Sequence, residues 1–484
     1  MSEPIYRLNR GPAKCALDLG DGSERGEYVN QDYILGKLGR PHRAITLMYC
    51  YYPLDEGWPG RASVVHAHDD VKFAWDYPYD DYFPYTGGLN GSPDSETFEK
   101  MQDVRRHGQD VLLTLTIDPH VSDEHLIAIA EDLRPYGRVI LRINHEATGD
   151  WFSFNKRCSY KEVADFFVRA SRTIKEHAPN VQTIICIGGI EAMDAKEMTK
   201  EQEFAATIPA ADIWSVDKYM ALHWGWPFDV AERGGNSHAR HSIGFTYDTA
   251  KLSFLRFKEL NGGVEKPMYM SEFNADGDVV GPYDQCRMMH EFVERLKNDD
   301  GWLKGISFYQ FRDAGRLGLE IEDPNNKYVG IEQPILKAYK EEMLDDPYFS
   351  PADECAEAVE LPVKLRWGSS EDAEGIAFEM PLESDPHFFE VYFEDELLSG
   401  NFIFEVNGKW FYKAPGVKCI DCMSAFFGKE ARESFTFKLY APPATGKNDP
   451  AQGEGWEKDY YYELRKMPRF RVLFEPVEVK SKED

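Results

Sequence analysis

Two glutamates stand at the ends of short apolar runs. Glu146 closes the stretch ILRINHE, residues 140–146, and Glu272 lies in YMSEF, residues 269–273. Two opposed carboxyl groups are what cleavage of a glycosidic bond requires, because one protonates the leaving oxygen while the other attacks or stabilises the sugar carbon. As the acid, Glu146 would need a raised pKa, whereas Glu272 as the nucleophile would need hydrogen-bond donors around it. One glutamate alone would be interpreted as a solvated loop residue, but two in matching positions favour a site.

Further polar and aromatic residues gather at the ends of the same runs. Tyr219 is expected to donate a hydrogen bond to Glu272, and Arg142 is expected to keep that glutamate ionised. The aromatic loop 73–88 either walls a cleft for sugar rings or packs on itself, and the sequence leaves both open. The residues predicted to bind substrate are Arg142, Asn144, His145, Trp151, Asp217, Tyr219, His223, Trp224, Trp226, Trp75, Tyr309 and Gln310.

The elements that must position these residues alternate along the chain. Apolar runs begin near residues 13, 43, 110, 138, 181, 211, 266 and 304, with helical patterns between them. This alternation predicts a (β/α)8 barrel, whose active sites lie at the C-terminal ends of the strands. Glu146 follows the fourth run and Glu272 the seventh, so the two side chains would face each other across the barrel mouth. An open nucleotide-binding sheet is disfavoured because no G-x-G-x-x-G spacing follows the first run.

The pattern changes after residue 345. Residues 360–484 show short alternating runs with turn residues between them, including VNGK at 406–409, which is typical of a β-hairpin. We therefore predict two domains, a catalytic barrel over residues 1–345 and an antiparallel β-sandwich over residues 360–484. The sandwich is expected to be accessory or to bind carbohydrate.

Composition limits the partners of the chain. A formal net charge of -29 over 484 residues disfavours nucleic acid and anionic membrane surfaces. The stretch HAHDD at 66–70 fits no metal-ligand spacing, and we expect neither a metal nor an organic cofactor. The N-terminus has no apolar signal region, which predicts a cytoplasmic protein if the chain is complete and a secreted one if a signal peptide was removed. The oligomeric state is left open.

The run RINHEATGDWF followed by MSEFN resembles the retaining glycoside hydrolases of clan GH-A. Within that clan it is most similar to glycoside hydrolase family 26, the β-mannanase family, which DIWSVDKY at 212–219 also resembles. The resemblance implies that Glu146 is the acid/base, that Glu272 is the nucleophile and that Tyr219 is the partner of the nucleophile. It also implies that Arg142 and His145 shape the site and that Trp151 forms a sugar platform, on a β-mannan-like substrate.

Two other interpretations remain. The barrel could bind carbohydrate without turnover, although the presence of both glutamates together with a Tyr and a His speaks against this. A barrel lyase or hydrolase that uses one carboxylate is the other alternative, and it predicts that only one of the two glutamates matters.

Overall fold

The computed structural model describes most of the chain. The described residues are 5–9, 14–23, 28–39, 42–62, 82–92, 95–106, 109–136, 138–188, 200, 202–223, 238–299, 301–313, 315–323, 325–346, 348–349, 352–355, 362–367, 375–381, 386–393, 397–400, 402–426, 434–440 and 460–474. They fall into two compact units, one over residues 14–346 and the other over residues 1–13 together with 347–484.

The first unit is a closed barrel of parallel strands. Within the described residues, each strand pairs in parallel with the next and the last pairs with the first. Each of the eight apolar runs forms one of these strands, so the predicted (β/α)8 barrel is confirmed. In order around the ring they are β2 (Ala16–Gly20), β3 (Ala44–Tyr51), β5 (Asp110–Ile117), β6 (Val139–Ile143), β7 (Val181–Cys186), β8 (Ile213–His223), β10 (Met268–Ala275) and β11 (Leu303–Phe308).

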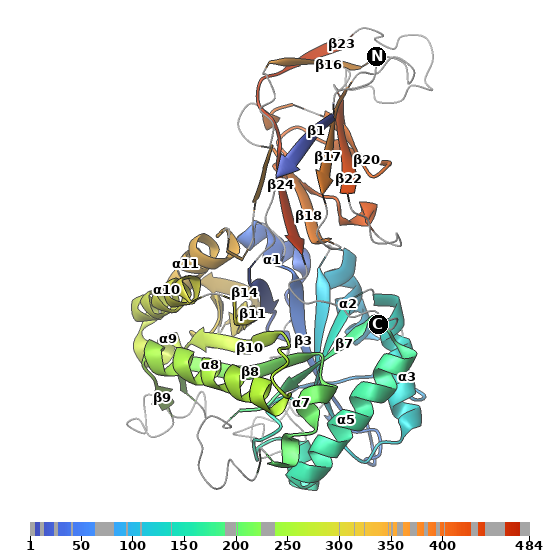
Figure 1. The fold of residues 1–484 in the computed structure, drawn as a ribbon, viewed down its shortest axis with the longest axis vertical. Helices are drawn as coiled ribbons and strands as arrows, with labels where there is room; N and C mark the ends of the chain where they lie inside the picture. Colours follow the sequence, from blue (N-terminus) through green and yellow to red (C-terminus); the bar gives the residue numbers. More distant parts are fainter. Residues whose placement is uncertain are drawn as a thin grey trace. The chain divides into compact units, whose positions relative to one another are not determined.

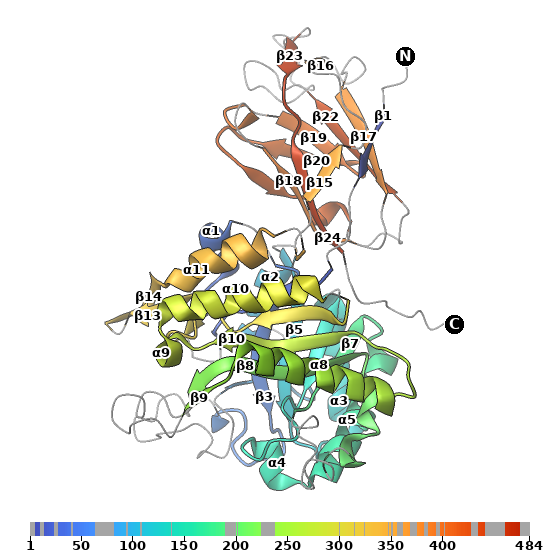
Figure 2. The ribbon, with the colours of Figure 1, turned by 60° about the vertical axis from the view of Figure 1, so that its left-hand side comes forward.

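Helices cover the outside of this ring, as α5, α8 and α10 show in Figures 1 and 2. Helix α5 begins at a capping box, in which Ser159 and Glu162 satisfy each other's backbone N–H groups, and it buries an apolar stripe that includes Phe166 and Ile174. The helices of this unit are α1 (Gln31–Leu38), α2 (Glu96–Arg106), α3 (Asp123–Leu133), η4 (Arg134–Tyr136), α4 (Ser153–Arg157), α5 (Tyr160–His177), α7 (Thr207–Ala210), α8 (Ile243–Leu260), α9 (Gly277–Val280), α10 (Pro282–Asn298), α11 (Pro334–Tyr339) and η6 (Lys340–Leu344).

Short strands accompany the barrel at its margins. Strand β4 (Phe83–Pro84) pairs with β3, and β9 (His238–Arg240) pairs with β8. After β11, the strands β12 (Arg312–Asp313), β13 (Glu320–Asp323) and β14 (Asn326–Glu332) form a small sheet. Most residues of the barrel strands are buried, and in β5 all eight are, because helices and interior side chains cover both faces.

The second unit is a β-sandwich, as the sequence predicted. Strand β1 (Ile5–Asn9) lies here rather than in the barrel, because its first residues pair with β17 and its last with β15. Aromatic residues that are distant in sequence pack together in the core of this unit. Phe437 packs against Phe470 and Phe389 against Phe435, with ring centroids 4.7 Å apart in both pairs. The further elements are β15 (Ala352–Cys355), β16 (Val363–Trp367), β17 (Gly375–Pro381), β18 (Pro386–Tyr392), β19 (Phe402–Val406), β20 (Lys409–Lys413), β21 (Cys419–Asp421), η8 (Met423–Ala425), β22 (Ser434–Tyr440), β23 (Tyr460–Leu464) and β24 (Arg469–Phe474).

The turn between β19 and β20 confirms the β-hairpin that VNGK at residues 406–409 predicts. Asn407 and Gly408 both adopt positive φ, 50° and 79°, while Val406 pairs with Lys409. These are the backbone conformations of a two-residue turn that matches the twist of the flanking strands.

Candidate active site

Glu146 and Glu272 lie at the same end of the barrel. Glu146 follows β6 by three residues, and Glu272 lies within β10, three places around the ring. Burial, and then the nearby carboxyl groups of Asp217 and Glu272, raise the pKa of Glu146 well above its ordinary value. Glu146 therefore has the raised pKa that an acid catalyst needs, as the sequence analysis expected.

Glu272 receives hydrogen bonds on both of its carboxyl oxygens. Nη2 of Arg142 donates to Oε1 at 2.7 Å, and the hydroxyl of Tyr219 donates to Oε2 at 2.6 Å. Glu272 is only 8% exposed. Both predicted donors are confirmed, and together they fix the orientation of the carboxylate and offset its negative charge.

Arg142 is fully buried, and its guanidinium donates hydrogen bonds to several groups. Its Nε donates to the Thr114 hydroxyl at 2.8 Å, and its Nη1 donates to Oδ1 of Asp217 at 3.2 Å. Burial, and then the charge of Glu272, raise the pKa of Asp217 to about 7. One guanidinium thus lies among the carboxyl groups of Glu146, Asp217 and Glu272 within the described part of the site. Like charges so close together do not all ionise, which favours protonated forms among them.

The backbone turns sharply after β6 and presents Glu146. Asn144 and Glu146 adopt positive φ of 47° and 49°, a left-handed conformation that is uncommon for residues other than glycine. The side chain of Asn144 donates to the carbonyl of Ile117 at 3.1 Å and accepts from its N–H at 2.6 Å. Asn144, predicted to bind substrate, is therefore used to join β6 to the end of β5 beneath the site.

Trp151 lies over the loop that follows Glu146. Its side chain is 44% exposed, and a hydrogen bond from it to Glu146 lowers the pKa of that glutamate against the larger effects of burial and neighbouring charge. A Cβ atom on Gly149 would lie 2.7 Å from the indole ring. The glycine of the HEATGDW stretch is therefore required for the Trp151 ring to fold back toward the acid.

His145 is buried between aromatic rings. Its Nε2 lies 2.9 Å from the hydroxyl of Tyr82 and 3.9 Å from Oε1 of Glu272, and its ring centroid is 4.6 Å from that of Phe152. Burial, and then the charge of Arg142, lower the pKa of His145 well below its ordinary value, so the imidazole is neutral at physiological pH. Tyr82 and Phe152 were not in the predicted set, although the aromatic loop 73–88 contains Tyr82.

The remaining predicted residues have different surroundings. Tyr309 meets Tyr219 edge to face, with ring centroids 6.0 Å apart. Gln310 is fully buried and donates to Asp313 at 2.9 Å, so it supports the loop after β11 from within. His223 ends β8, where its backbone pairs with β9. The last three predicted residues lie outside the described part of the chain: Trp75, Trp224 and Trp226.

A cavity of about 350 Å³ opens beside the acid. Glu146, Trp151 and Asp217 line it, as predicted residues of the site. The other lining residues were not predicted from the sequence, because a cysteine or a lysine within a strand carries no distinctive signal. They are Thr148, Gly149, Asp150, Cys186, Gly188, Lys200 and Lys218.

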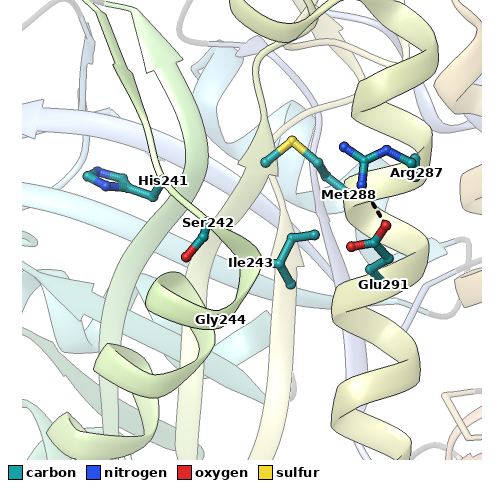
Figure 3. Close-up of a pocket in the computed structure, with 7 residues that line it drawn as sticks. All are labelled: His241, Ser242, Ile243, Gly244, Arg287, Met288 and Glu291. Atoms are coloured by element: carbon teal, nitrogen blue, oxygen red, sulfur yellow. Dashed lines mark hydrogen bonds and ion pairs between the residues drawn. The ribbon is translucent and has the colours of Figure 1, made fainter.

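A second cavity, of about 560 Å³, lies away from these carboxyl groups. Figure 3 shows it between the start of α8, at His241 and Ser242, and the Arg287 and Glu291 side chains of α10. Arg287 and Glu291 form an ion pair with each other at 2.5 Å. None of the predicted site residues lines this cavity, so its greater volume does not make it the candidate site.

The described residues provide neither a metal-binding cluster nor a membrane-spanning helix. No cluster of three or more His, Cys, Asp or Glu side chains in this part of the chain is arranged to hold a metal ion. Nor is any described helix long and apolar enough to cross a membrane.

Comparison with known proteins finds solved structures that are similar to this chain. No protein-family model and no curated protein matches the chain. A GH51 α-L-arabinofuranosidase from Thermotoga petrophila RKU-1 is 12% identical with a TM-score of 0.41, covering 97% of each chain. A GH26 β-mannanase from Bacteroides ovatus is 10% identical with a TM-score of 0.42, covering 69% of this chain and 89% of its own. A family 39 glycoside hydrolase from Bacteroides cellulosilyticus WH2 is 11% identical with a TM-score of 0.40, covering 96% and 81%.

Proposed function

We propose that the protein is a retaining glycoside hydrolase with Glu146 as acid/base and Glu272 as nucleophile. One observation carries the proposal: two carboxyl groups at one barrel mouth have opposite environments. Glu146 has a strongly raised pKa, which suits a proton donor, whereas Glu272 accepts hydrogen bonds from Arg142 and Tyr219 on its two oxygens. Pairs of carboxyl groups separated in this way divide acid and nucleophile roles between them.

The reaction would proceed in two displacements. In the first, a carboxylate oxygen of Glu272 bonds to the anomeric carbon as the glycosidic C–O bond breaks, and the proton of Glu146 passes to the leaving oxygen. In the second, Glu146 takes a proton from water, whose oxygen then bonds to the anomeric carbon and releases Glu272. His145 is neutral and therefore too weak an acid to protonate the leaving group in place of Glu146.

The substrate we propose is a β-linked polysaccharide or oligosaccharide, with a β-mannan-like glycan as the leading choice. Trp151 supports a sugar ligand because its exposed indole lies beside the acid, where aromatic faces pack on the C–H faces of sugar rings. The β-mannan choice follows from the resemblance of HEATGDWF and SEF to family 26. The strongly negative chain supports a glycan without negative charge.

The test compares the wild type with Glu146→Ala and Glu272→Ala on β-mannan, arabinan, xylan and sulfated polysaccharides. Azide then separates the two roles. In Glu272→Ala, azide can replace the missing nucleophile in one displacement and give a glycosyl azide of inverted configuration. In Glu146→Ala, a 2,4-dinitrophenyl glycoside forms the glycosyl-enzyme because its phenolate leaves without a proton, and azide then displaces Glu272 and gives the glycosyl azide of retained configuration. Equal rescue with one configuration in both variants would contradict the assigned roles.

The second candidate is a carbohydrate-binding barrel without turnover. If all three proteins bind one glycan equally and none cleaves it, the protein is a binding protein and the proposed activity is wrong. If only one of the two variants loses cleavage, a mechanism with one carboxylate replaces the double displacement.

A further inference from the structure

Two large aromatic side chains are exposed on the second unit. Trp410 is 54% exposed and Tyr412 is 45% exposed, and both lie on β20. The alternation of β20 places Phe411 and Lys413 on the opposite face, where Phe411 packs against the core and Lys413 is buried. Trp410 and Tyr412 therefore share the outer face of the sheet, with Cβ atoms about 7 Å apart along the strand.

Trp410 is fixed in place by a third ring. Its indole stacks on Tyr440 with ring centroids 5.1 Å apart and an interplanar angle of 26°. Tyr440 lies on β22, two strands away across β19, and is only 6% exposed. Figure 2 shows β19, β20 and β22 in the same sheet. Trp410 therefore reaches across the sheet and has a restricted position, which lowers the entropy lost when a ligand binds.

Polar groups of both signs lie in the same rows of the sheet. Glu405 of β19 pairs in register with Trp410, and Lys438 of β22 pairs in register with Glu405. Residues in register across neighbouring strands point to the same face, so an acid and a base lie beside the aromatic rings. Both side chains are partly exposed. A surface with rings flanked by one hydrogen-bond acceptor and one donor of opposite charge suits a ligand that is uncharged and rich in hydroxyl groups.

We propose that Trp410, Tyr412 and Tyr440, here called the aromatic platform, bind a neutral polysaccharide at a second site that is separate from the barrel cleft. Aromatic rings exposed in pairs cost free energy in water unless a ligand covers them. The negative chain disfavours an anionic polymer, and the balanced pair of Glu405 and Lys438 offers no excess charge for a charged one. This inference goes beyond the proposed hydrolysis and does not depend on it.

The experiment measures polysaccharide binding by the full chain in a Glu272→Gln background, so that polymer is not cut. Native gels are cast with soluble galactomannan, with arabinoxylan or with mixed-linkage β-glucan, and the retardation gives a dissociation constant. We expect retardation by at least one polymer. Trp410→Ala should weaken that binding about tenfold, because it removes one ring contact and uncovers Tyr440. Tyr412→Ala should weaken it less and reports on the same face without disturbing the stack.

Phe245→Ala is the matched control, since Phe245 is a 53% exposed aromatic residue on α8 of the barrel unit. It should leave the retardation unchanged, and any binding in the barrel cleft is common to all variants. The proposal is overturned if none of the three polymers retards the parent, or if Trp410→Ala and Tyr412→Ala migrate as the parent does. It is also overturned if sedimentation shows that Trp410→Ala converts a dimer into monomers, because the platform would then contact a second copy of the chain.

Discussion

Two fully buried arginines in the barrel have opposite surroundings. Arg43 precedes β3, and its Nε donates to Asp18 at 2.8 Å while its guanidinium also contacts the hydroxyl and ring of Tyr269. Arg142 lies on β6, and among the described residues it binds two carboxylates, those of Asp217 and Glu272. The first arginine is matched to its partner, whereas the second is placed among more carboxyl groups than it can neutralise.

The position along the strand explains this difference. Arg43 stands at the N-terminal end of its strand, the end of a barrel that contributes to stability, and Arg142 stands near the C-terminal end, where barrels carry out chemistry. A matched buried ion pair leaves no group with an altered protonation state to offer a substrate. Around Arg142, burial and then the excess of carboxyl groups raise the pKa of Glu146 and Asp217, which makes proton transfer near neutral pH possible.

The largest effect is expected from Arg142→Met. Loss of the guanidinium removes the hydrogen bond to Glu272 and its only charged donor among the described residues, so kcat/KM should fall by about 10³-fold. Steady-state kinetics on the identified glycan measures this. Arg142→Lys keeps the charge but not the two-pronged geometry and should recover only part of the loss. Activity within threefold of the wild type in Arg142→Met would show that the two arginines do not differ in role.

Arg43→Met should lower stability and leave the activity unchanged. Leaving Asp18 buried without its partner is expected to lower the free energy of unfolding by about 3–5 kcal/mol. At temperatures where the variant is folded, kcat/KM should equal that of the wild type. Chemical denaturation and kinetics on the same samples test both parts. Arg43→Met combined with Asp18→Leu should regain much of the stability, whereas a fall in kcat/KM without loss of stability would remove the contrast.

The contrast between these arginines also shows what the sequence can predict. All eight strands were recognisable because a strand covered on both faces is a continuous apolar run, whatever its partners. The placement of β1 in the second unit was not predictable, because five residues that pair with two distant strands leave no local pattern. Glu146, Glu272, Arg142 and Tyr219 could be proposed as candidate site residues because the active sites of barrels lie at a fixed end of the strands.

Other parts of the site depend on contacts distant in sequence. The bond between Tyr82 and His145 joins a loop after β3 to the end of β6, and no spacing within one segment encodes it. An asparagine at position 144 could bind either sugar or neighbouring backbone, and the sequence does not distinguish these roles. The structure shows that its side chain binds the backbone of Ile117. The pairing of Arg43 has no signal in the sequence for the same reason, because its partner Asp18 is 25 residues away.

The third prediction concerns the pH dependence of the free energy of unfolding, to which the surroundings of Arg142 and those of Arg43 should contribute differently. The pKa of Asp217 in the folded protein, about 7, lies above its ordinary value of 3.8, so the folded state binds more protons than the unfolded state between these values. The contribution of Asp217 to stability is therefore present below about pH 4 and is lost as the pH rises toward 7. Asp217→Asn should flatten the pH dependence of the free energy of unfolding over this range. The double variant Arg43→Met with Asp18→Leu, which removes both charges of the matched pair, should keep the slope of the wild type, and a slope unchanged by Asp217→Asn would contradict the raised pKa.

The smallest effect is expected from Gly149→Ala, which changes the site around Arg142 without touching a charge. The added methyl would collide with the Trp151 ring, so the indole must move and its hydrogen bond to Glu146 is lost. Because that bond lowers the pKa of Glu146, the alkaline limb of kcat/KM should shift to higher pH, and weaker sugar contact should lower kcat/KM about tenfold through KM. Gly188→Ala is the matched control: it lines the same cavity, yet a Cβ there meets no atom of the described residues within 4 Å. If both variants shift the pH profile alike, the effect is a general disturbance of the cavity and Trp151 does not tune the acid.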